Sequence, residues 1–339
     1  MSATPEFRHT DRLHELRQWL HTTPAAGGTG LTPASADASF RRYFRVAGAE
    51  RSYIVMDAPP DKEDCAPFIR VAGMLADAGL HVPDIIASDT SQGFLLLSDL
   101  GPTTYLQALN SANSDALFRD AIAAMVCMQT RVDSASLPAY DEGLLRRELA
   151  LFPDWYISRH LGQPLDENSR NALAGVETAL VQSALAQPVV FTHRDYMPRN
   201  LMVSTPNPGI LDFQDAVAGP ISYDPVCLFK DAFISWSEEQ VLDWTVRYWE
   251  SGRRAGLPLD SDFGRFYQAF EWMGVHRHLK VLGIFARIRY RDGKPAYLED
   301  APRFLNYLRP VCARYRELLP LAHLLDHLES KGPQVGYTF

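Results

Sequence analysis

The chain has 339 residues, a formal net charge of −8 and 46% hydrophobic residues. This size and mixture are typical of one large or two medium globular domains and exclude disordered or collagen-like classes. The acidic excess and the lack of a basic block argue against nucleic-acid and anionic-membrane binding. No run of about 18 apolar residues predicts a membrane span.

The N-terminal segment and the cysteines both bear on the cellular compartment of the protein. The first 17 residues are charged and contain no apolar core of the kind found in secretory signals. The four cysteines are far apart and form no CxxC pair or metal-binding spacing. We therefore expect a cytoplasmic protein whose thiols are reduced.

The first hundred residues predict a small β-rich lobe. Leu13, Leu16, Trp19 and Leu20 recur at helical spacing, which predicts an N-terminal helix before a flexible connector at 23–33. The segments that follow read as four strands around one helix. The expected strands cover 39–46, 53–56, 82–88 and 94–98, and the expected helix covers 64–78.

The rest of the chain is mainly helical in pattern. Helices are expected at 103–110, 115–131, 144–160, 167–186, 238–251, 262–289, 302–316 and 318–329, with short strands at 189–191, 201–203 and 210–213. Strands grouped first and helices grouped later predict an α+β fold. We expect a nucleotide-binding lobe over 1–100, a catalytic and substrate-binding lobe over 101–339, and a joint at 98–100.

The most informative segment is 191–216, FTHRDYMPRNLMVSTPNPGILDFQDA. It holds His193-x-Asp195, then Asn200, then Asp212 after a short strand and a Pro/Gly turn. A hairpin of this kind brings Asn200 and Asp212 close together. The alternative to a functional site is a surface loop in which these side chains cap turns. The added strand, turn and second aspartate argue against that alternative.

This set of side chains suits phosphoryl transfer. Carboxylate and amide oxygens are the ligands that Mg²⁺ prefers, so Asp212 and Asn200 are the candidate metal ligands. A third carboxylate has to orient the attacking hydroxyl and accept its proton, and Asp195 is the candidate for that role. His193 is expected to brace the loop.

The motif resembles the catalytic and metal-binding segments of the protein-kinase-like superfamily, and more closely the aminoglycoside phosphotransferase/choline kinase family. The continuation over 212–225, with Gly219-Pro220 and Tyr223-Asp224-Pro225, carries this resemblance. It implies a two-lobed kinase fold that uses ATP and Mg²⁺. Only a few residues separate Asp212 from Gly219-Pro220, which leaves little room for a peptide platform and favours a small substrate.

The resemblance narrows over longer stretches. The loop HRDYMPRNLM and the segments at 277–285, 291–294 and 302–308 are similar to the bacterial anomeric sugar kinases. These enzymes phosphorylate N-acetylmuramate and N-acetylglucosamine at C1 in peptidoglycan recycling. The resemblance implies the same reaction here, with the sugar 1-phosphate passed to a uridylyltransferase.

The sequence departs from the superfamily on the phosphate side. Kinases usually pair a strand Lys with a helix Glu, but Met56 or Asp57 falls near the expected Lys, and 68–70 contains no Glu. There is no GxGxxG either. The candidate replacements are Ser39, Arg41, Arg42 and Arg45. Two alternatives stay open: the arginines only decorate an exposed face, or Mg²⁺ alone binds the phosphates.

The remaining contacts follow from the resemblance. Adenine is expected to meet backbone groups around Ser98, Asp99 and Leu100. The expected sugar contacts are Tyr196, Arg199, Asp215, Trp155 and Tyr156, with core packing as the alternative for Trp155. Arg199 and Arg277 are candidates for the lactyl carboxylate of N-acetylmuramate.

Two other functions remain open at this point. One is a kinase of another small hydroxylated substrate, such as an aminoglycoside, choline or homoserine. The other is a non-catalytic nucleotide-binding pseudokinase, which the missing strand Lys motivates and the intact Asp195, Asn200 and Asp212 oppose.

Overall fold

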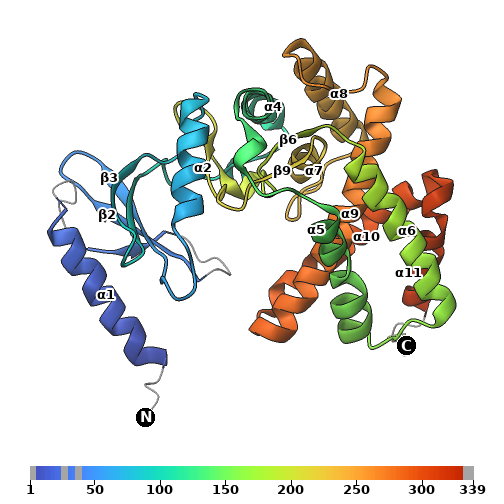
Figure 1. Cartoon of the computed structure of the whole chain (residues 1–339), viewed down its shortest axis with the longest axis horizontal. Coiled ribbons are helices and arrows are strands. Elements are labelled where there is room, and N and C mark those ends of the chain that lie inside the picture. Colours follow the sequence, from blue (N-terminus) through green and yellow to red (C-terminus); the bar gives the residue numbers. More distant parts are fainter. Residues whose placement is uncertain (1–4, 24–29, 35–39, 331–339) are drawn as a thin grey trace. The chain divides into compact units, whose positions relative to one another are not determined.

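A computed structural model describes residues 5–23, 30–34 and 40–330. The chain forms two compact units (Figure 1). The smaller unit combines Met1–Asn113 with Arg199–Asp215, and the larger combines Ser114–Pro198 with Ala216–Phe339. This division differs from the predicted boundary after residue 100, because the segment with Asn200 and Asp212 joins the smaller unit.

The smaller unit is built on a five-stranded antiparallel sheet in the order β1-β2-β3-β5-β4. The strands are β1 Thr32–Pro33, β2 Arg42–Ala47, β3 Ser52–Asp57, β4 Ile85–Asp89 and β5 Phe94–Ser98, and the helices are α1 Pro5–His21, α2 Ala66–Asp77 and α3 Tyr105–Ala108. The predicted strands and both long helices are present. The helix expected at 103–110 shrinks to four residues.

One face of this sheet packs against α1. Leu16 and Leu20 are fully buried there with Val46, Val55 and Phe94. Strand residues alternate between the two faces of a sheet, so Phe44 and Val46 face α1 while Arg45 lies on the opposite face.

Segment 199–215 returns to the smaller unit through several contacts. It forms the hairpin β7 Leu201–Met202 and β8 Gly209–Ile210, and Phe213 packs on Phe68 of α2 with ring centroids 4.9 Å apart. Gly209 forms an isolated bridge with His81. A Cβ at Gly209 would lie 2.8 Å from a Leu100 methyl group, so a larger residue there would displace the end of the Leu100 side chain.

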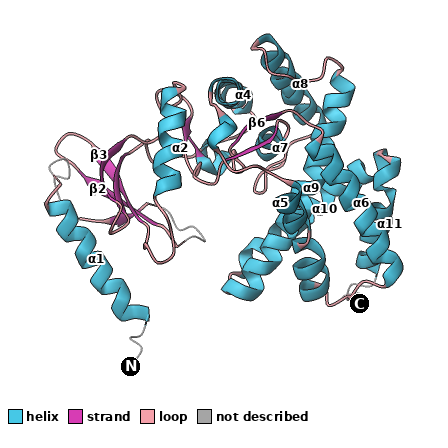
Figure 2. Ribbon diagram, viewed as in Figure 1, coloured by secondary structure: helices cyan, strands magenta, loops and turns pink. Residues whose placement is uncertain are grey.

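The larger unit is mainly helical, with one two-stranded ladder of β6 and β9 (Figure 2). Its elements are α4 Ser114–Arg131, η1 Ser134–Ser136, α5 Glu142–Leu149, η2 Phe152–His160, α6 Glu167–Leu185, β6 Val189–Thr192, β9 Val217–Pro220, α7 Tyr223–Phe229, α8 Glu238–Arg254, α9 Phe263–Asp292, η4 Pro295–Asp300, α10 Ala301–Arg314, η5 Arg316–Leu318 and α11 Leu319–Ser330. The short helix η3 Pro198–Asn200 crosses the boundary, because Pro198 belongs to the larger unit and its other two residues to the smaller one.

Helix α9 is the centre of the larger unit. Nearly every residue from Phe270 to Leu282 is buried. Gly283 permits a close approach, because a Cβ at this position would lie 2.3 Å from the carbonyl carbon of Leu151. The helix ends at Gly293, whose φ of 71° lies in the left-handed region that favours glycine.

Two differences from the predicted elements concern the site. The helix expected at 144–160 divides into α5 and the π-helix η2, whose first turn contains Pro153. A proline inside a continuous α-helix would clash with the preceding turn. Strand β9 and helix α7 were not predicted, because their Gly-Pro and Asp-Pro pairs are typical of turns.

Across residues 5–23, 30–34 and 40–330, no helix is both long enough and apolar enough to span a membrane.

Candidate active site

The smaller unit holds the two predicted metal ligands on one hairpin. Asn200 and Asp212 flank β7 and β8, where Leu201 pairs with Ile210. The Asn200 side-chain amide donates to Asp212 Oδ2 at 3.2 Å, and Leu211 N–H donates to the Asn200 carbonyl at 2.9 Å. The hairpin therefore brings these two side chains together.

Asp212 is exposed and has an unusual backbone. Its φ of 63° lies in the left-handed region, which is uncommon for a residue other than glycine. Gln214 donates from Nε2 to Asp212 Oδ1 at 2.9 Å and to Asp215 Oδ2 at 3.3 Å. Amide groups thus hold both oxygens of Asp212, and the contacts of Gln214 were not predicted from the sequence.

The donor atoms of Asn200 and Asp212 are of the kind that Mg²⁺ prefers. Mg²⁺ is usually held by one or two carboxylates together with substrate phosphates and water. Asp212 and Asn200 supply one carboxylate and one amide oxygen. The described part of the chain contains no group of three or more His, Cys, Asp or Glu that could hold a metal ion.

The larger unit holds the loop with Asp195. Strand β6 pairs with β9 and leads directly into His193. His193 is fully buried, and its ring Nδ1 accepts the backbone N–H of Asp195 at 3.3 Å. Met197 N–H donates to the Asp195 carbonyl at 2.9 Å. Asp195 itself is half-buried, and Arg194 has a φ of 75°.

Asp224 on α7 holds the backbone of the loop that carries Asp195. Its carboxylate oxygens accept the backbone N–H groups of His193 at 2.7 Å and Arg194 at 3.0 Å. Burial raises the pKa of Asp224 to about 7, although the two N–H groups act against that rise. The sequence placed Asp224 only in a family motif, so its anchoring contacts are a finding of the structure.

A second support is a buried ionic cluster around Glu148 of α5. Its Oε1 lies 2.6 Å from an Arg194 nitrogen and 2.8 Å from Lys280 Nζ, and Tyr140 O–H donates to its other oxygen. Burial alone would raise the pKa of Glu148, but Lys280 and Arg194 outweigh it and lower the pKa to about 2. The cluster thereby fixes the Arg194 side chain.

Cys227 and Arg277 complete the support. Burial raises the pKa of Cys227 to about 12, so its thiol stays protonated and donates to the Arg194 carbonyl at 3.1 Å. Arg277 Nε donates to the same sulfur at 2.9 Å. Only 2% of Arg277 is exposed, which favours this internal role over the predicted contact with a lactyl carboxylate.

The candidate phosphate-binding arginines all have carboxylate partners. Arg42 Nε donates to the fully buried Asp57 at 2.9 Å, on the face that packs against α1, and Arg12 of α1 binds the same carboxylate at 2.7 Å. Arg42 is therefore a structural residue here. Arg41 lies 2.8 Å from Glu63, near the start of α2. Ser39 lies outside the described residues.

Arg45 organises the segment expected to meet adenine. It donates to both carboxylate oxygens of Asp99, at 2.6 and 3.0 Å, and to the Gly101 carbonyl at 3.1 Å. Ser98 is tied to Asp84, whose N–H donates to Ser98 Oγ at 2.8 Å. The Asp99 side chain thus fixes the backbone that leads to Leu100.

The predicted sugar contacts have different exposures. Tyr196 is fully buried and donates from its hydroxyl to the Ala121 carbonyl at 2.8 Å, so the structure assigns it a packing role instead. Tyr156 is also buried, stacks on Phe152 and has a pKa raised by burial to about 12. Trp155 and Arg199 are partly exposed, and Asp215 is exposed.

Comparison with known proteins decides the family. Residues 30–259 match the model of the phosphotransferase enzyme family. The chain belongs to this family. It is 57% identical over 311 residues to an N-acetylmuramate/N-acetylglucosamine kinase of Pseudomonas aeruginosa, covering 91% of this chain and 90% of the relative. The Neisseria meningitidis protein of the same name is 47% identical, covering 97% and 99%.

Solved structures confirm the predicted fold. A choline kinase from Streptococcus pneumoniae matches with a TM-score of 0.63 at 12% identity, covering 89% of this chain and 100% of that chain. An ADP-bound aminoglycoside phosphotransferase, APH(2'')-Ib, matches with a TM-score of 0.58 at 14% identity, covering 86% and 97%. These structures confirm the α+β kinase-like fold. The family match and the kinase relatives confirm the prediction of an ATP-dependent phosphotransferase.

Proposed function

We propose that this phosphotransferase transfers the γ-phosphate of ATP to the anomeric hydroxyl of N-acetylmuramate and N-acetylglucosamine. The observation that carries the proposal is the identity with kinases of that name over nearly the whole chain. The anomeric hydroxyl is more acidic than an ordinary alcohol, so a carboxylate is a sufficient base for it.

In this proposal the roles divide between the two catalytic segments. Asp195 orients the sugar hydroxyl and accepts its proton, which positions the oxygen for attack on the phosphorus. Asn200 and Asp212 hold Mg²⁺, which when bound neutralises charge on the phosphates. Asp224, Glu148 and their partners keep the loop of Asp195 in one conformation.

On the nucleotide side we propose Arg41 as the phosphate-binding cation. Its pair with Glu63, at the start of α2, reproduces the chemistry of the missing Lys–Glu pair: a cation held in place by a carboxylate near that helix. Arg45 acts through Asp99, by shaping the backbone at 98–100 that meets adenine. This assignment leaves no need for the pseudokinase alternative.

For the sugar we propose Trp155, Arg199 and Asp215 as contacts, because each is at least partly exposed. The product would be a sugar 1-phosphate, the class of substrate that a uridylyltransferase consumes. We place the reaction in the cytoplasm, within peptidoglycan recycling.

A coupled ATP-consumption assay with Mg²⁺ tests this function. The acceptors are N-acetylmuramate, N-acetylglucosamine, glucose, choline and kanamycin, and the matched control is the 1-O-methyl glycoside of N-acetylglucosamine. We expect turnover with the two free N-acetyl sugars and none with the glycoside. Turnover only with choline or kanamycin would replace the proposed substrate, and ATP binding without any turnover would overturn the kinase.

A further inference from the structure

Helix α9 carries an arginine whose charge has no partner. Arg287 is partly exposed and forms no ion pair or hydrogen bond with any residue of the described ranges. Its Nε is buried, whereas the two terminal nitrogens of the guanidinium are accessible to solvent. Those two nitrogens form the planar fork of donors with which an arginine binds a carboxylate.

Arg287 lies on the face of α9 that begins beside the loop of Asp195. Spacings of four and three residues put on this face the positions 280, 284, 287 and 291. Lys280 is buried there in the cluster of Glu148 that supports the loop. Ile284 and Arg287 are partly exposed. The face therefore leads from the reactive loop toward the surface.

The spacing along α9 suits a substituent of the sugar and not its reacting hydroxyl. Seven residues at 1.5 Å each place the Cα of Arg287 roughly 10 Å from the Cα of Lys280. Side chains on a helix tilt toward its N-terminus, which directs Arg287 back toward Lys280. A sugar whose reacting hydroxyl lies at Asp195 would thus meet Arg287 through a group elsewhere on its ring.

The π-helix η2 places an aromatic ring level with Arg287. Leu151, just before η2, lies against Gly283, and the last residue of η2 is a histidine whose Nδ1 lies 3.1 Å from the Tyr290 hydroxyl. The two helices therefore run parallel, and Trp155 lies near the turn of α9 that contains Arg287. Trp155 is partly exposed, and π-helical segments are frequent at functional sites.

The charge of Arg287 is incompletely compensated within the protein. Burial lowers the pKa of Arg287, Arg291 lowers it further, and Asp292 offsets only part of the change. Asp292 is itself paired with Arg291, with 2.6 Å between Oδ1 and Nε. An anion at the accessible nitrogens of Arg287 would balance this charge. Ile284, one turn earlier on the same face, offers an apolar surface beside it.

We propose that Arg287 binds the lactyl carboxylate of N-acetylmuramate and thereby sets the preference for this sugar over N-acetylglucosamine. The inference rests on the proposed kinase function. The two sugars differ by a lactyl ether on the third ring carbon, which adds one carboxylate and one methyl group. The carboxylate meets Arg287, the methyl group meets Ile284, and the sugar ring lies against Trp155.

The test compares the two sugars in Arg287→Gln. We expect kcat/KM for N-acetylmuramate to fall by about tenfold or more relative to kcat/KM for N-acetylglucosamine, because one charge-assisted pair is lost. Arg287→Lys keeps the charge without the planar fork and should give a smaller fall. The methyl ester of N-acetylmuramate removes the carboxylate instead, so Arg287→Gln should treat acid and ester alike, whereas wild type should prefer the acid.

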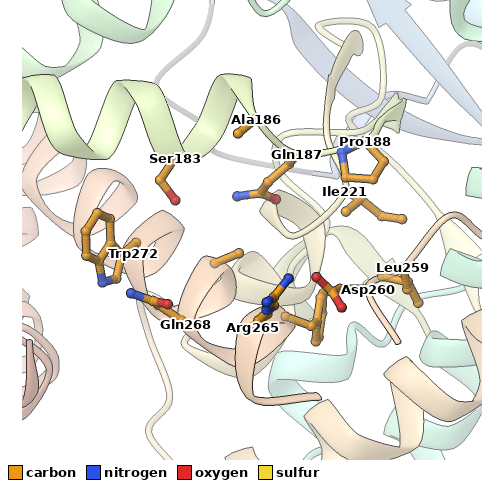
Figure 3. Close-up of a pocket in the computed structure, with 12 residues that line it drawn as sticks. Ser183, Ala186, Gln187, Pro188, Ile221, Leu259, Asp260, Arg265, Gln268 and Trp272 are labelled. Atoms are coloured by element: carbon orange, nitrogen blue, oxygen red, sulfur yellow. The ribbon is translucent and has the colours of Figure 1, made fainter. Parts of the chain in front are cut away.

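Two other arginines of α9 are the controls. Arg289→Gln changes an exposed arginine two positions away, whose guanidinium lies over the Tyr290 ring at 5.6 Å. Arg265→Gln changes an exposed arginine in the first turn, where it lines a hollow together with Asp260 (Figure 3). It lies roughly 33 Å from Arg287 along the helix axis. Both variants should keep the wild-type ratio between the two sugars.

Four outcomes would overturn the proposal. They are an equal fall for both sugars in Arg287→Gln, an unchanged ratio, a rise confined to the KM for ATP, and equal use of acid and ester by wild type. An unchanged ratio together with a selective fall in Arg199→Gln would give the carboxylate to Arg199 instead. If Arg287→Gln does not fold, Arg287→Lys and the ester provide the same comparison.

Calorimetry with each sugar repeats the comparison without turnover. Wild type that binds N-acetylmuramate more tightly than its ester, and loses this difference in Arg287→Gln, would support the inference even if no phosphate were transferred. Turnover of both sugars with no effect of Arg287→Gln would refute the inference and leave the kinase function standing. The failure of one proposal is therefore distinguishable from the failure of the other.

Discussion

The two catalytic segments are held in place by different means. The hairpin with Asn200 and Asp212 relies on short strands and on amides that contact an exposed carboxylate. The loop with Asp195 lies on buried charges: Asp224 beneath its backbone and Glu148 between Arg194 and Lys280. The hairpin thus presents the exposed carboxylate of Asp212, whereas the side chains that hold the reactive loop are buried and costly to disturb.

The largest effect should come from the reactive carboxylate itself. Asp195→Ala should lower kcat by roughly 10²–10⁴, the usual contribution of a general base, while ATP affinity stays close to wild type. Steady-state kinetics and nucleotide titration measure the two effects. The control is Asp154→Asn, an exposed aspartate of the same unit. Wild-type turnover in Asp195→Ala would remove its role.

The second prediction compares the stability lost with a buried ion pair with that lost with an exposed one. Glu148→Gln leaves Arg194 and Lys280 without their shared carboxylate and should lower the free energy of unfolding by about 3–5 kcal/mol. Glu142→Gln, on the same helix but in an exposed pair with Arg146, should cost less than about 0.5 kcal/mol. Denaturant unfolding compares them, and equal losses would contradict the distinction.

Asp224 should make the free energy of unfolding depend on pH. Its folded pKa of about 7 lies above the ordinary value of 3.8, so between these pH values the folded state holds a proton that the unfolded state has lost. Its contribution to stability therefore falls as pH rises through this window, by up to about 1.4 kcal/mol per pH unit.

Asp224→Asn should remove that pH dependence. Unfolding measured from pH 4 to 8 in both proteins gives the difference between their curves. A difference that does not change with pH across this range would mean that Asp224 is ionised throughout in the folded protein.

The smallest expected effect concerns Tyr196, which follows Asp195 in the chain and is buried in the larger unit. Tyr196→Phe removes one buried hydrogen bond to Ala121 and should cost about 1 kcal/mol of stability. The KM for the sugar should not change. A large increase in KM with unchanged stability would restore the sugar contact that the sequence predicted.

The sequence predicted the exposed segment better than the buried support. The spacing of Asn200 and Asp212 around a Pro/Gly turn indicated a hairpin, since turn residues act locally. Glu148 gave no signal, because a glutamate on a helix with several charged neighbours looks solvent-exposed. The role of Lys280 could not be predicted either, since its partner Glu148 lies 132 positions away along the chain and only the tertiary fold brings the two together.

The ion-pair partners of the strand arginines also could not be predicted from the sequence. Alternation along a strand such as β2 separates its two faces, but it does not show that Asp57 pairs with Arg42 or that Asp99 pairs with Arg45. The register between β2 and β3 and the packing of α1 decide these partners. The sequence therefore offered several candidate phosphate contacts, and the ion pairs of Arg42 and Arg45 became visible only in the structure.

The most direct test of the central claim is phosphorus NMR of the product formed from ATP, Mg²⁺ and N-acetylmuramate by the full chain. Attack by the anomeric hydroxyl, with Asp195 as base, predicts a phosphate signal coupled to the anomeric proton, and formation of the same product slowed by roughly 10²–10⁴ in Asp195→Ala. A phosphate coupled to any other sugar proton, or inorganic phosphate alone, would contradict the account.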